Sequence, residues 1–346
     1  MPAPIRRVDE LGFPIPSKFD EFQTGETEPR PPKRSIFERL GQWRWLILLM
    51  VPAVLFGPQA VKFVRSIVAN IQLERAEKDV RRRDLPQAVF HASRAIAWEP
   101  DPQRRALALA FRGQLNEKLK HLDESLRDYD EAIAIIGQEK SQPGIAIELA
   151  VLYHYRAWVQ HRRGHDREAL DDCKTALAVF PGSRQFPASN SSAELLNLKA
   201  YICALSGLEV EDGMKAINEA LRAEGEHNAA MLDTRACLEY RQGKFDAALN
   251  DMEMAVPLAE AVRNGRQVGW DAGPVFVAPD EEEFDNESFA VMLDHRGEIH
   301  RKLAGESKDK DEIESHRKKA DADFARAKEL GFDAKQDEAL EPAPRK

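Results

Sequence analysis

Apolar residues recur with a helical period over residues 153–181, and this stretch predicts two short helices joined by a tight turn. In the first helix, Tyr153 and Ala157 share one face, and Gly164 then interrupts the pattern. In the second, small residues recur at i, i+4 and i+7, namely Ala169, Cys173 and Ala176. Each helix therefore carries one apolar stripe that small residues allow to pack closely. One pair of this size cannot bury its stripes alone, so the pattern predicts neighbouring pairs.

Copies of this pattern occur on both sides of residues 153–181. Six copies are found, each identified by the first small residue of its expected second helix. These residues are Ala88, Ser125, Ala169, Gly213, Ala248 and Ala320. The steps between them range from 35 to 72 residues, so no strict period is kept. The last copy has roughly 11 extra residues between Gly297 and Ala320, which is close to three helical turns and predicts longer helices there.

The order of large, small and aromatic residues in these copies resembles the tetratricopeptide repeat (TPR) family. The residues that carry the resemblance include Leu109, Gly113, Tyr129 and Ala132 in one copy, and Leu232, Ala236, Ala248 and Met252 in another. The resemblance implies an all-α fold, a right-handed α-solenoid of about six degenerate helix pairs. It implies little about the ligand, because one repeat fold serves many functions.

The chain ahead of the repeats divides into two further segments. Residues 1–44 are rich in proline without apolar periodicity, which predicts a disordered tail with a basic end. Residues 45–61 contain no charged side chain and predict a transmembrane anchor helix over 45–64. The solenoid is then expected over 65–332, with an irregular insertion at 264–288 and a frayed tail at 333–346.

The apolar segment has two alternatives, a cleaved signal peptide and a buried core helix. Five basic residues precede the segment and three follow within about 15 residues, the window that governs orientation. The sequence therefore predicts a single-pass membrane protein with its N-terminus in the cytoplasm and its repeats on the other side.

Charge and cysteine content limit the function classes. The net charge is −9. An acidic repeat array binds nucleic acid poorly, because phosphate binding requires a basic surface. Cys173, Cys203 and Cys237 fall among packing positions. We therefore interpret them as small buried residues and not as a disulfide framework.

No motif for catalysis or cofactor binding is present, such as a phosphate-binding loop, a nucleophile elbow or a CxxC pair. His161 and His165 flank the Gly164 turn and are not expected to share a face. Residues 294–300 contain Asp, Glu and two His, but His295 and His300 point apart on a helix. We therefore expect no enzyme activity, no cofactor and no metal.

The resemblance implies that the first helix of each pair lines a groove, and it supplies the candidate partner-binding residues. They are His154, Trp158, His161, Asn197, Tyr201, Asp233, Tyr240, Asp294 and Glu298. Aromatic and hydrogen-bonding side chains suit an extended peptide or a partner helix. The alternative is that these side chains pack against the next repeat. The Lys, Asn and Arg of the family's clamp for chaperone tails are absent from the matching positions.

These observations predict a non-enzymatic, membrane-anchored scaffold or adaptor that binds a protein or peptide partner. Two alternatives stay open. One is an obligate membrane adaptor subunit of an enzyme complex, and the other is a homo-oligomer in which the groove is filled by a second copy.

Overall fold

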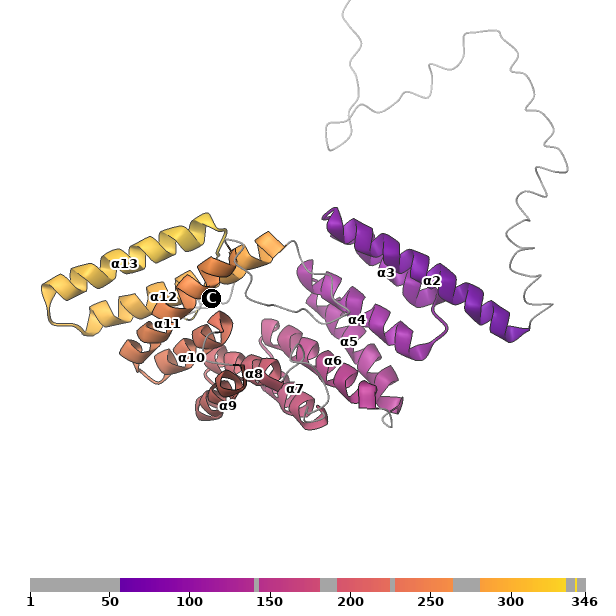
Figure 1. Cartoon of the computed structure of the whole chain (residues 1–346), viewed down its shortest axis with the longest axis horizontal. Coiled ribbons are helices and arrows are strands. Elements are labelled where there is room, and N and C mark those ends of the chain that lie inside the picture. Colours follow the sequence, from indigo (N-terminus) through magenta and orange to yellow (C-terminus); the bar gives the residue numbers. More distant parts are fainter. Residues whose placement is uncertain are drawn as a thin grey trace, which may run out of the picture. The chain divides into compact units, whose positions relative to one another are not determined.

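The computed structural model describes residues 57–139, 143–180, 192–224, 228–263, 281–333 and 340. Within these ranges it contains twelve α-helices, one 3₁₀ turn and no strand, so the predicted all-helical class is confirmed (Figure 1). The chain divides into two units, Met1–Ala60 and Val61–Lys346. Every described helix lies in the second unit, except that residues 58–60 at the start of the first helix belong to the first unit.

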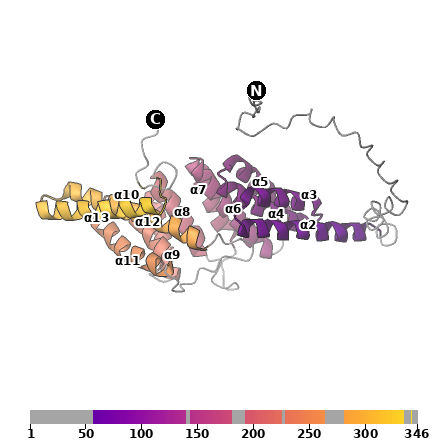
Figure 2. The ribbon, with the colours of Figure 1, turned by 90° about the horizontal axis from the view of Figure 1, so that it is seen from above.

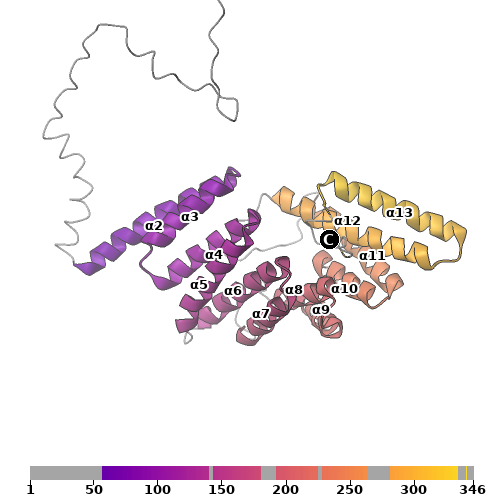
Figure 3. The same cartoon turned by 180° about the vertical axis from the view of Figure 1, so that it is seen from behind.

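The helices form six consecutive pairs, as the repeated pattern predicts. Their bounds are α2 Pro58–Arg81 and α3 Leu85–Trp98, α4 Pro102–Lys118 and α5 Leu122–Ile136, α6 Pro143–Arg162 and α7 Asp166–Val179, α8 Ser192–Ser206 and α9 Val210–Glu224, α10 Ala229–Arg241 and α11 Phe245–Arg263, and α12 Glu281–Glu306 and α13 Lys310–Glu329. The 3₁₀ turn η1, Gly137–Glu139, follows α5. Each described helix contacts the next along the chain from α3 onwards, and Figure 2 and Figure 3 show the same succession of pairs from two further directions.

Local sequence sets where the helices begin and turn. Asp84, Asp101 and Asp309 cap α3, α4 and α13 by accepting a hydrogen bond from a backbone N–H of the first turn. In five of the six pairs, the chain between the two helices turns through at least one residue with positive φ, and Gly164 takes this role between α6 and α7 with φ of 78°. The break predicted at Gly164 is therefore confirmed.

Small residues lie where the two helices of a pair approach most closely. A Cβ atom on Gly213 would meet Cys203 at 2.7 Å, and one on Gly113 would meet the Tyr129 ring at 3.1 Å. The three cysteines are buried and free, as their positions in the pattern predict. Close contact between helices therefore depends on side-chain size at these positions.

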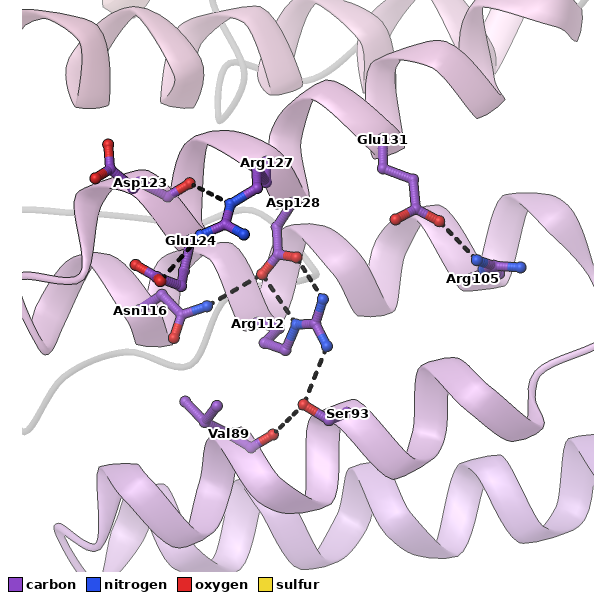
Figure 4. Close-up of polar contacts among 10 residues, drawn as sticks. All are labelled: Val89, Ser93, Arg105, Arg112, Asn116, Asp123, Glu124, Arg127, Asp128 and Glu131. Carbon is purple, nitrogen blue, oxygen red and sulfur yellow. Dashed lines mark hydrogen bonds and ion pairs between the residues drawn. The ribbon is translucent and has the colours of Figure 1, made fainter.

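An arginine of the first helix pairs with an aspartate of the second in four of the six pairs. Arg112 donates from Nε and Nη2 to the two carboxylate oxygens of Asp128 at 3.0 and 2.5 Å (Figure 4). The three equivalent pairs are Arg156–Asp172, Arg235–Asp251 and Arg296–Asp323, each bonded at two points. The aspartate side chains are at most 9% exposed. We refer to these four pairs as the arginine–aspartate ladder.

The ladder also joins one helix pair to the preceding pair. Arg112 Nη1 donates to Ser93 Oγ of α3 at 3.0 Å, and the Ser93 hydroxyl donates in turn to the Val89 carbonyl (Figure 4). Arg156 Nη1 donates to Asp130 Oδ1 of α5 at 2.6 Å. One guanidinium group thus holds three helices together through charge-assisted hydrogen bonds.

The last pair shows that the extra residues of the sixth copy lengthen both helices, as predicted. Helix α12 has 26 residues and α13 has 20. The ladder spacing widens from 16 residues in the earlier pairs to 27 in Arg296–Asp323, yet the contact is kept. Residues 281–288, the end of the predicted irregular insertion, are helical and begin α12, whereas 264–280 lie outside the described residues.

The predicted membrane localisation is contradicted. Within the described ranges, no helix combines the length and the apolar character needed to cross a bilayer. Residues 58–64 of the predicted span begin α2, which continues through the charged sequence of residues 74–81 and buries Ala69, Gln72 and Ala76 within the repeats. Residues 45–56, like the tail at 1–44, lie outside the described residues.

Candidate protein-binding face

Two aromatic rings from neighbouring first helices stack on one another. The rings of Trp158 on α6 and Tyr201 on α8 have centroids 6.1 Å apart and planes inclined by 24°. His161 lies one turn beyond Trp158, with its ring centroid 5.8 Å from the indole. All three side chains are partly exposed. The structure therefore brings together three of the nine candidate residues. We call the surface that Trp158, His161 and Tyr201 form on α6 and α8 the first-helix face.

Contacts from α4 and α6 fix the orientation of the Trp158 ring. Trp158 hydrogen-bonds the carboxyl group of Glu117, which also lies 3.4 Å from Arg162 Nη1. Burial raises the pKa of Glu117 above its usual range, and the charge of Arg162 and the hydrogen bond from Trp158 partly offset this rise. The indole is thus held in a defined position, which lowers the entropy lost when it contacts a ligand.

His154 and Asn197 each leave one polar atom unsatisfied. His154 Nδ1 and Asn197 Oδ1 are buried and have no hydrogen-bond partner among the described residues. Burial lowers the pKa of His154 to about 4, so its imidazole is neutral at pH 7. His154 lies one turn before Trp158 and Asn197 one turn before Tyr201. Each aromatic side chain therefore has an unsatisfied polar neighbour on its own helix.

The remaining candidates take part in packing within the repeats. Tyr240 is 6% exposed and lies edge-on to Phe245 with ring centroids 5.3 Å apart. Asp294 and Glu298 are buried on α12, and Glu298 pairs with Arg301 at 2.5 Å. His161, already placed beside Trp158, also contacts the second helix of its pair, because its Nδ1 atom lies 2.6 Å from Asp166 Oδ1 of α7.

Asp233 is also buried, and it forms a polar cluster that sequence reasoning missed. Its Oδ1 atom lies 2.8 Å from His295 Nδ1, and Cys237 Sγ lies 3.3 Å from the same nitrogen. Burial opposes a charge on His295, but Asp233 and Cys237 outweigh it and raise the pKa of His295 well above its usual value. The helical period relates His295 only to residues of its own helix, whereas its partners lie 58 and 62 residues earlier.

Comparison with known proteins gives no match to a family model and no curated relative. Solved structures that resemble the chain include a tetratricopeptide repeat protein from Parabacteroides merdae, with 17% identity, coverage of 77% of this chain and 94% of that one, and a TM-score of 0.46. PilW, a type IV pilus biogenesis factor, shows 16% identity, coverage of 72% and 97%, and a TM-score of 0.44. A TPR protein from Thermus thermophilus shows 20% identity, coverage of 56% and 92%, and a TM-score of 0.39.

Proposed function

We propose that this chain is a non-enzymatic scaffold or adaptor that binds an extended segment of a protein partner across its first-helix face. The observation that carries the proposal is the stacked pair of Trp158 and Tyr201. Stacked, partly exposed aromatic side chains from two successive repeats offer a large apolar surface at low entropic cost, and such residues dominate the binding energy of protein interfaces.

The polar neighbours of these rings support a peptide ligand. Asn197 Oδ1 and His154 Nδ1 are buried without a hydrogen-bond partner among the described residues, which costs free energy in the unbound protein. A bound main chain supplies N–H groups that satisfy such atoms once the side chains rotate towards it. We therefore place the ligand's backbone over α6 and α8 and its apolar side chains on Trp158 and Tyr201.

A peptide-display selection on the full chain tests the proposal. A random peptide library is panned on the immobilised protein, and the affinities of enriched peptides are measured for the wild type, Trp158→Ala and Tyr201→Ala. We expect each variant to weaken binding by about tenfold or more, the effect of losing a residue that dominates an interface. Circular dichroism verifies that both variants remain folded.

Phe90→Ala is the matched control. Phe90 is a 50% exposed aromatic residue on α3, a second helix, so its removal should leave peptide affinity unchanged. Equal loss of binding in all three variants, or unchanged binding in Trp158→Ala and Tyr201→Ala, would exclude the first-helix face as the ligand site.

A further inference from the structure

Three metal-ligating side chains from two helices converge beneath the first-helix face. Asp233 and Cys237 lie one turn apart on α10, and His295 reaches them from α12. The carboxylate oxygen, the sulfur and the imidazole nitrogen all lie within 4.8 Å of one another. Among the described residues, no other group of three His, Cys, Asp or Glu side chains meets this criterion.

His295 Nδ1 lies within hydrogen-bonding distance of two other atoms of the cluster. One nitrogen faces both Asp233 Oδ1 at 2.8 Å and Cys237 Sγ at 3.3 Å. Nδ1 carries at most one hydrogen, and one hydrogen forms a good bond to one acceptor. A cation placed among the three atoms contacts all of them at once, which a single proton on Nδ1 does not.

Burial increases the need for a compensating charge. His295 and Cys237 have 0% exposure, and Asp233 has 5%. A buried carboxylate requires a positive charge beside it, which either a protonated His295 or a bound cation supplies. A divalent cation supplies this charge and, by binding the sulfur as thiolate, releases its proton to solvent.

We propose that Asp233, Cys237 and His295 bind a zinc ion that fastens α10 to α12. The combination of sulfur, nitrogen and oxygen ligands suits Zn²⁺, whereas Mg²⁺ and Ca²⁺ take oxygen ligands. A tetrahedral zinc ion with its usual bond lengths places sulfur and nitrogen about 3.6 Å apart. The Cys237–His295 distance of 3.3 Å is close to this value, whereas the Asp233–His295 distance of 2.8 Å is a hydrogen-bond distance and must lengthen when the metal binds.

Three protein ligands leave the fourth tetrahedral position of the zinc ion for a water molecule, because the burial of all three ligands gives a larger group no access. The site lies next to the proposed peptide-binding residues, since the ring centroid of Tyr201 is 6.5 Å from that of His295. The zinc proposal does not depend on peptide binding, because its ligands and its test are separate.

Refolding the full chain with the metal alone tests the site, because a fully buried site takes up its ion during folding. The protein is unfolded in guanidinium with a chelator, then refolded with either zinc chloride or chelator and desalted. We expect about one zinc ion per chain by elemental analysis and a higher Tm for the zinc-refolded sample. Refolded wild-type protein without retained zinc, or with equal Tm values, would overturn the proposal.

Variants distinguish this site from zinc bound elsewhere. Cys237→Ser and His295→Gln should lose the zinc, and Asp233→Asn should weaken its binding by about 10-fold or more. Cys173→Ser, at a buried cysteine on α7 outside the cluster, should retain it. The same zinc content in all four variants would exclude these ligands.

Cobalt provides a measurement that remains informative if a variant folds poorly. Wild-type protein refolded with Co²⁺ should show the near-ultraviolet charge-transfer absorption of a cobalt–thiolate bond. The Cys173→Ser control should keep this band, whereas a cobalt-loaded wild type that lacks it would show that Cys237 is not a ligand.

Discussion

The ring of Phe324 on α13 lies directly over Gly297 of α12, so close that a Cβ atom at residue 297 would come within 2.6 Å of it. Residues 297 and 324 are 27 positions apart in the sequence. Their contact joins the two helices of the last pair. A methyl group at residue 297 requires the ring or the helix to move, because protein interiors are close-packed.

We therefore expect Gly297→Ala to lower the free energy of unfolding by about 1–3 kcal/mol, the usual cost of overpacking. Gly305→Ala is the matched control on the same helix, since a Cβ at residue 305 has no atom within 4 Å. Alanine has a higher helix propensity than glycine, so Gly305→Ala should leave the free energy of unfolding unchanged or raise it by up to about 1 kcal/mol. Denaturant unfolding measures both, and equal effects would show that Phe324 does not limit residue 297.

The arginine–aspartate ladder gives a second stability prediction. Arg156 binds Asp172 at two points and Asp130 at a third, and the Asp172 side chain is 9% exposed. We expect Arg156→Ala to destabilise the protein by about 2–3 kcal/mol, because it leaves a buried carboxylate unpaired. A double-mutant cycle with Asp172→Asn measures the coupling, which should exceed about 1 kcal/mol.

An exposed ion pair provides the comparison. Arg127 and Glu124 form an i, i+3 pair with side chains 72% and 52% exposed. Arg127→Ala should change stability by less than about 0.5 kcal/mol, as is usual for surface pairs. If Arg156→Ala is as mild, the ladder does not contribute to holding the repeats together.

The ladder shows which parts of the fold the sequence predicts and which it hides. The small residues that pack helix pairs, such as Ala157 and Gly213, follow from periodicity, because close approach restricts side-chain size. The periodicity does not mark Asp172 as buried, because its polarity fits an exposed helix face. The constant spacing of 16 residues between arginine and aspartate in three pairs was present in the sequence and would have revealed the contact.

The candidate site was only partly predictable for a different reason. Trp158 and Tyr201 are both large and lie at matching positions of neighbouring first helices, so their proximity follows from the repeat. Tyr240 and Asp294 lie at similar positions but are buried, because how far a first helix is covered depends on its neighbours. His295 meets residues about 60 positions away, and no single-helix pattern carries that information.

Stability should depend on pH through His300 on α12. Its Nδ1 atom lies 2.9 Å from His316 Nδ1 of α13. Burial and the neighbouring His316, Lys319 and Arg296 lower the pKa of His300 to about 4, while Asp323 opposes them. The unfolded chain, with an ordinary histidine pKa near 6.5, therefore binds a proton at a higher pH than the folded chain does.

Because unfolding takes up this proton, the stability that His300 contributes is present above about pH 6.5 and is lost as the pH falls towards 4. We expect the free energy of unfolding to decrease by on the order of 1 kcal/mol between pH 7 and pH 5 from this residue. His300→Gln should flatten that part of the profile, whereas His121→Gln, at an exposed position without a capping hydrogen bond, should not. Parallel profiles for wild type and His300→Gln would contradict the assignment.

A proline inside α11 gives the last prediction. Pro257 is an exposed residue within Phe245–Arg263, and its ring removes the backbone N–H that would bond the carbonyl of Glu253. Interior prolines cost a helix about 3 kcal/mol, although proline also restricts the unfolded chain and offsets part of this cost. We therefore expect Pro257→Ala to raise the free energy of unfolding by about 1 kcal/mol or more. Glu253→Ala, an exposed substitution on the same helix, should be close to neutral because it restores no hydrogen bond. A loss of stability in Pro257→Ala would instead show that the proline stabilises the folded helix beside Val256, which is 5% exposed.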